Sequence, residues 1–130
     1  MDISLDNIEK RYSDIPYPDG KQDRVNLVKE ILLYSPHELN DKASCAQLLI
    51  DIFGDQVALY ESLHEEDEYL IFHWVEKNWD SNSFEDTDLL ISVLLHLQLK
   101  EVKGFLVEKK DTSNNTRIEK MLLEAISELD

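Results

Sequence analysis

The segment TRIEKMLLEAISEL, residues 116–129, carries the clearest structural pattern in the chain. Its apolar residues recur at helical spacing, at Ile118, Met121, Leu122, Ala125, Ile126 and Leu129. Because residues three and four apart lie on the same side of an α-helix, this spacing predicts an amphipathic helix with one buried stripe. Thr116 and Glu119 match a capping box, which predicts where this helix begins.

Working outward, similar helical patterns fill most of the 130-residue chain, and only three glycines and three prolines interrupt them. So few turn-forming residues argue against an all-β fold. We therefore predict an all-α protein of about eight helices in a single domain, residues 1–130. The expected helices begin near Met1, Asp23, Asn40, Asp55, Asp67, Ser83, Val102 and Thr116. Gly54 is expected to end the third helix, and Gly104 to allow a close approach to a neighbouring element.

One internal similarity bears on the architecture. A shift of 45 residues aligns Cys45, Leu48, Leu49 and Ile52 with Leu90, Val93, Leu94 and Leu97. This period falls in the range of helical solenoid repeats such as HEAT and armadillo. Any two amphipathic helical hairpins with similar loops would match equally well. HEAT-like stacked helical pairs and an irregular bundle therefore stay open as alternatives.

The chain is strongly acidic, with a net charge of −15 from 28 acidic and 13 basic residues. The charge is uneven, because residues 51–90 hold twelve acids and the single base Lys77, a net −11. A field of this sign repels nucleic acid and anionic membranes and attracts basic proteins. Acids near the expected helix starts also stabilise the helix dipole, which explains Asp67, Glu68, Glu85, Asp86 and Asp88 in part.

The remaining acids of this segment interleave with aromatic residues, of which Trp74 is expected in the core. Acidic side chains that steer a partner, with aromatic anchors among them, are typical of tight electrostatic interfaces. We therefore predict a surface that binds a basic protein. The expected partner-binding residues are Glu61, Glu65, Glu66, Asp67, Glu68, Tyr69, Trp79, Asp80, Glu85 and Asp86.

Sequence patterns for catalysis or metal binding are weak. Cys45 lies on an apolar stripe, where a thiol is typically inert, and none of the four histidines lies in a recognised catalytic pattern. Glu61 and His64 have the Glu-x-x-His spacing of di-iron bundles, but no second pair exists. The segment from Asp80 lacks the glycine and the final glutamate of a calcium loop. We therefore expect a non-enzymatic protein with no cofactor and no metal.

The sequence also predicts a cellular location. The acidic N-terminus does not resemble a signal peptide, and the longest apolar stretch, residues 89–99, is too short to span a bilayer. A single cysteine cannot form an internal disulfide. We expect a cytoplasmic protein that does not enter a membrane.

In its size, its helical character and the charge-dense segment Glu61–Asp88, the chain resembles the small acidic immunity proteins that neutralise bacterial nuclease toxins, including those of contact-dependent growth inhibition systems. The resemblance implies a cytoplasmic inhibitor that covers the basic RNA- or DNA-binding cleft of a cognate toxin. The side chains that would replace the phosphate charges are Glu65, Glu66, Asp67, Glu68, Asp80, Glu85 and Asp86. The alternatives are a nucleic-acid mimic or adaptor that binds a basic host protein, and a helical-repeat scaffold whose acidity serves solubility.

Overall fold

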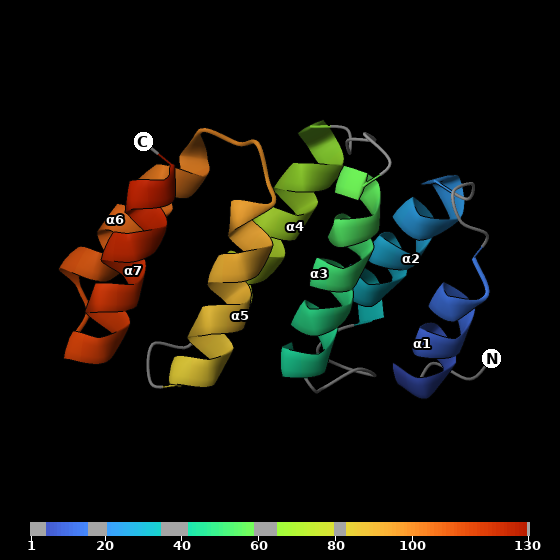
Figure 1. Ribbon diagram of the computed structural model, residues 1–130, viewed down its shortest axis with the longest axis horizontal. Coiled ribbons are helices and arrows are strands. Elements are labelled where there is room, and N and C mark those ends of the chain that lie inside the picture. Colours follow the sequence, from blue (N-terminus) through green and yellow to red (C-terminus); the bar gives the residue numbers. More distant parts are fainter. Residues whose placement is uncertain (1–4, 16–20, 35–41, 59–64, 80–82, 130) are drawn as a thin grey trace. The chain divides into compact units, whose positions relative to one another are not determined.

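The computed structural model describes residues 5–15, 21–34, 42–58, 65–79 and 83–129, apart from the side chains at 5, 21, 34, 42, 43 and 53–58. These ranges contain seven helices and no strand, which confirms the all-α class (Figure 1). The chain packs as two compact units, Met1–Asp67 and Glu68–Asp130. The single-domain expectation stays a prediction, because two packing units can belong to one domain.

The first unit contains α1 (Leu5–Ser13), α2 (Lys21–Tyr34) and α3 (Lys42–Ala58), and each of these helices contacts the other two. Their buried apolar residues are Ile8, Val25, Leu27, Val28, Ile31, Cys45, Ala46, Leu48, Leu49 and Ile52. A nine-residue helix such as α1 is unstable alone, so packing must hold it. The Arg11 guanidinium donates two hydrogen bonds to the Glu30 carboxylate of α2, and the Tyr12 hydroxyl donates one to the Asp51 carbonyl of α3. These bonds fix α1 to both neighbours.

The course of α3 corrects one prediction. The helix runs from Lys42 to Ala58, through both Gly54 and Asp55, so the predicted stop and the predicted new start are wrong. A glycine inside a helix costs only about 1 kcal/mol. Such a cost weakens a helix without ending it. The rest of the predicted fourth helix, residues 59–63, lies outside the described residues.

The helix boundaries also resolve the 45-residue similarity. The shift places α3 on residues 87–103, where the structure has most of α5 (Phe84–Leu95), a connection and the start of α6 (Glu101–Asp111). One continuous helix is thus aligned with two separate helices. The match comes from the shared apolar spacing and is not a structural repeat.

The second unit contains most of α4 (Glu65–Asn78), together with α5, α6 and α7 (Thr116–Glu128). α7 packs against both α5 and α6, and Figure 1 shows α6 and α7 side by side. The Phe105 ring of α6 makes edge-to-face contacts with Phe72 of α4 and with Trp79, at centroid distances of 5.6 and 5.3 Å. In α5, the apolar residues Leu90, Ile91, Val93 and Leu94 are buried.

Two of the predicted helix starts can be compared with observed caps. Ser83 precedes α5, and its hydroxyl accepts the backbone N–H of Asp86 at 3.2 Å, as the sequence predicts. For α7 the cap is Asn115, one residue before the predicted Thr116, and its side-chain oxygen accepts two backbone N–H groups. Asparagine is among the best N-cap residues, so it takes the position.

Gly104 is exposed, and a Cβ built there would meet no described atom within 4 Å, so the predicted close approach is wrong.

Candidate protein-binding surface

α4 presents one buried and one exposed face, and the exposed face is the candidate binding surface. The buried face holds Asp67, Ile71, Phe72, Trp74 and Val75, which confirms Trp74 as a core residue. The exposed residues are Glu65, Glu66, Leu70, His73, Glu76 and Lys77, hereafter the α4 outer face. At about 100° per residue, all six fall on one side of the helix. The outer face therefore carries three carboxylates and one ammonium group on a single rigid element.

Leu70 lies in the middle of the α4 outer face. Although it is apolar like its buried neighbour Ile71, the residue is 52% exposed. It follows Glu66 by four residues and precedes His73 by three, so it shares their side of the helix. Apolar contact area inside a polar rim is the usual composition of a protein interface.

The polar residues near Leu70 are held in place by contacts along α4. Nδ1 of His73 lies 2.8 Å from Oε1 of Glu76, one turn later in the helix. The His73 ring also stacks on Tyr69 at a centroid distance of 6.3 Å and meets the edge of Phe72 at 5.9 Å. These contacts restrict the rotamers of His73 and Glu76, so less side-chain entropy remains to be lost on binding.

The other acids in the first turn of α4 have structural contacts. Asp67 is buried, and one of its carboxylate oxygens lies 3.5 Å from Nζ of Lys29 in α2. Oε1 of Glu68 accepts the backbone N–H of Gln98 at 2.7 Å. These side chains therefore stabilise the fold, although both were predicted to bind the partner.

Tyr69 joins α4 to α6 in the second unit. Its hydroxyl donates a 2.8 Å hydrogen bond to Oε1 of Glu101, the first residue of α6. Because this bond favours the charged carboxylate, it lowers the pKa of Glu101, with smaller contributions from the backbone of Glu101 and the charge of Lys100. Tyr69 is half-buried, so its ring borders the outer face while its hydroxyl has a structural role.

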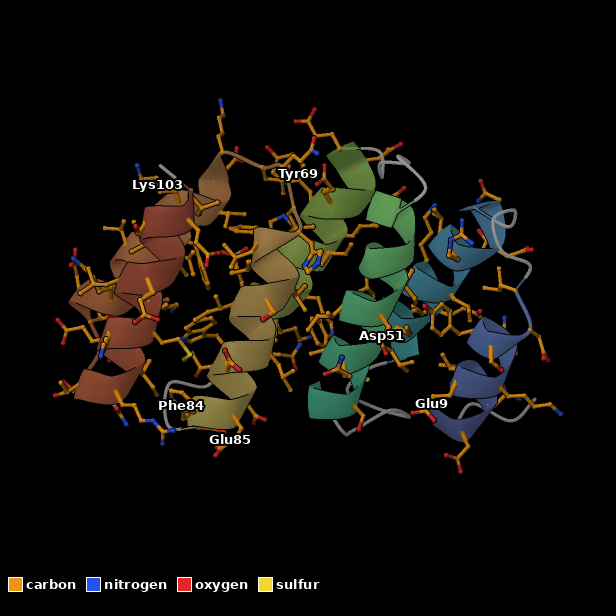
Figure 2. All side chains as sticks on the ribbon, in the orientation of Figure 1. Glu9, Asp51, Tyr69, Phe84, Glu85 and Lys103 are labelled. Atoms are coloured by element: carbon orange, nitrogen blue, oxygen red, sulfur yellow. The ribbon has the colours of Figure 1, made fainter. Side chains whose placement is uncertain are left out.

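The remaining predicted residues lie elsewhere. Trp79 is half-buried against Phe105. In the first turn of α5, Asp86 is half-exposed and Glu85 is exposed, the latter labelled in Figure 2. Glu61 and Asp80 lie outside the described residues. The outer face thus includes Glu65 and Glu66 from the prediction. Sequence reasoning did not select Leu70, His73 or Glu76, although a helical projection of residues 65–78 would have grouped all of them.

Within the described ranges, no group of three or more His, Cys, Asp and Glu residues could hold a metal ion. None of the described helices is both long enough and apolar enough to cross a membrane. Cys45, the single cysteine of the sequence, is buried. Comparisons with models of protein families, with curated proteins and with solved structures find no match to this chain.

Proposed function

We propose that this protein is an immunity-type inhibitor that binds the basic, nucleic-acid-binding domain of a bacterial toxin through the α4 outer face. The observation that carries the proposal is the exposure of Glu65, Glu66 and Glu76 on the same side of one helix as the half-exposed Leu70. Neither Glu65 nor Glu66 forms an ion pair with a described residue. Their charges remain available to a partner.

The electrostatics favour a basic partner over other classes. Like charges on one helix face repel each other, and cations of a partner would relieve that repulsion. A nuclease domain presents cationic side chains that bind the phosphates of its substrate, and carboxylates on a rigid helix can take the place of those phosphates. Complementary fields also accelerate the encounter, typically by about 10- to 1,000-fold. This role requires no catalytic group.

The test measures association with the product of the gene directly upstream, where the toxin of an immunity protein is expected. The double variant E65K/E66K should slow association at least tenfold at low salt, on the order of typical steering effects. The matched control is E124K/E128K, which makes the same charge change at two exposed residues of α7. Asp67 is left unchanged because its reversal would also break the ion pair with Lys29.

The outcomes separate the possibilities. Slow association of E65K/E66K with near-normal association of E124K/E128K supports the α4 outer face. Equal slowing of both variants would mean that only net charge matters. Failure of the wild-type protein to bind the upstream product even at low salt would reject the immunity function.

A further inference from the structure

A pocket in the first unit lies between the end of α1 and the first half of α2. Its volume is about 330 Å³, and the described residues that line it are Arg11, Asp14, Ile15, Asp23, Asn26 and Leu27. No residue of α4 takes part. Ligand binding in this pocket is therefore independent of the function proposed for the α4 outer face.

The charges in the pocket favour a cation. Among the described lining residues, the one cation is Arg11, which is held by the Glu30 carboxylate through two hydrogen bonds, so its charge is already compensated. Asp14 and Asp23 form no ion pair with a described residue. The described part of the lining thus has two carboxylates, both on exposed residues, that form no ion pair.

Asp14 occupies an unfavourable position for an acid. It follows the last residue of α1, Ser13, and its backbone N–H bonds the carbonyl of Lys10 in the last turn. The C-terminal end of a helix carries partial negative charge, so a carboxylate there is destabilised and a nearby cation is stabilised. A positively charged ligand would compensate both Asp14 and the helix end.

The residues of the walls indicate which cation fits. Hard divalent cations such as calcium take six to eight oxygen ligands, whereas the described lining offers two carboxylates and the side-chain amide of Asn26. Ile15 is half-buried and Leu27 is buried, which supplies apolar wall beside the acids. Arginine and lysine pack their methylene stems on apolar surface while the charged head meets carboxylates. We propose that this pocket binds a guanidinium or ammonium group carried on an aliphatic stem.

The first test titrates the full-length, ¹⁵N-labelled protein with arginine and, as a control, with citrulline, which has a similar shape but no charge. Arginine should cause saturable shifts of the backbone amide signals of Asp14, Asp23 and Asn26, and citrulline should not. The absence of saturable shifts with arginine, or equal shifts with citrulline, would overturn the proposal.

The second test compares two double variants that each remove two negative charges from the first unit. D14N/D23N should weaken arginine binding at least tenfold, as expected for the loss of charge-assisted hydrogen bonds. The control D6N/E9Q should change it by less than about twofold, because these exposed residues of α1 are not among the described lining residues and act on the ligand only through a screened field. Equal weakening would show a general field effect and overturn the proposal. If D14N/D23N loses helical circular dichroism, D14N alone serves, because removing that charge from a helix C-terminus favours the helix.

A third arm identifies the source of the group. Free arginine is compared with N-acetyl-arginine methylamide, which mimics an arginine inside a protein chain. Equal or tighter binding of the blocked compound supports the pocket and indicates a partner's side chain. Tighter binding of free arginine supports the pocket and indicates a small molecule, while binding of neither overturns it.

Discussion

The two faces of α4 contain similar residue types but have different environments. Ile71 is fully buried, whereas its neighbour Leu70 is 52% exposed. Asp67 is buried beside Lys29, whereas its neighbour Glu66 is exposed. Each residue turns the helix by about 100°, so adjacent side chains reach different surroundings. The density of acids along the sequence therefore says less about binding than the side of the helix on which each acid lies.

The largest expected difference between the faces is in packing. Ile71→Ala should lower the free energy of unfolding by about 2–5 kcal/mol, because it leaves a cavity in a packed core. Leu70→Ala, a truncation of similar size on the outer face, should change it by about 0.5 kcal/mol or less. Urea denaturation of both variants measures the difference. Equal destabilisation would show that Leu70 is also buried in solution.

A smaller difference is expected between the acids of the first turn. Asp67→Asn should lower the free energy of unfolding by about 1–3 kcal/mol, because a buried carboxylate loses its charge pairing with Lys29. Glu66→Gln should stay within about 0.5 kcal/mol of wild type, as surface substitutions usually do. The rate of association with the proposed toxin partner should show the opposite order, with Glu66→Gln slower than a still-folded Asp67→Asn. A reversed order in the free energy of unfolding or in the association rate would contradict the assignment of the two faces.

The smallest effect is expected at Tyr69, where α4 contacts α6. Tyr69→Phe removes the hydrogen bond to Glu101 and should raise the pKa of Glu101 toward its ordinary value of 4.5. A carboxyl group whose pKa is lowered by folding stabilises the protein above its unfolded pKa, and this contribution is lost as the pH falls through the folded pKa. Wild type should thus be more stable than Tyr69→Phe at neutral pH. The difference should shrink as the pH falls below 4.5 and disappear below the folded pKa of Glu101. NMR titration of the Glu101 carboxyl carbon measures this pKa in both proteins, and unfolding experiments at neutral and at acidic pH measure the difference in stability. A stability difference that does not change with pH would mean that the hydrogen bond does not set the pKa of Glu101.

Local sequence signals predicted several features well. The Ser83 cap, the apolar stripe of α7 and the buried position of Trp74 all follow from spacing and capping rules. Capping depends on side-chain and backbone atoms only a few residues apart, so the sequence contains the whole interaction. The one-residue error at Asn115 arose because two good capping residues are adjacent there.

Signals that depend on competition between local and distant interactions were less reliable. Gly54 does not end α3, because a glycine inside a helix costs only about 1 kcal/mol, which weakens the helix without ending it. The pocket at the end of α1 could not be predicted, since it joins Asp14 to residues of a different helix. A sequence pattern does not contain the distance between two helices.

By itself, the sequence determined the helical class, the surplus of acids between residues 51 and 90, and most helix starts, because composition and helical period are local properties. Only the tertiary structure decided which acids remain exposed. Asp67 forms an ion pair with Lys29, and Glu68 accepts a hydrogen bond from the backbone of Gln98. Both partners lie about thirty or more residues away in the chain. The charge of a residue is set by its chemistry, but its availability to a partner is set by what folding places beside it.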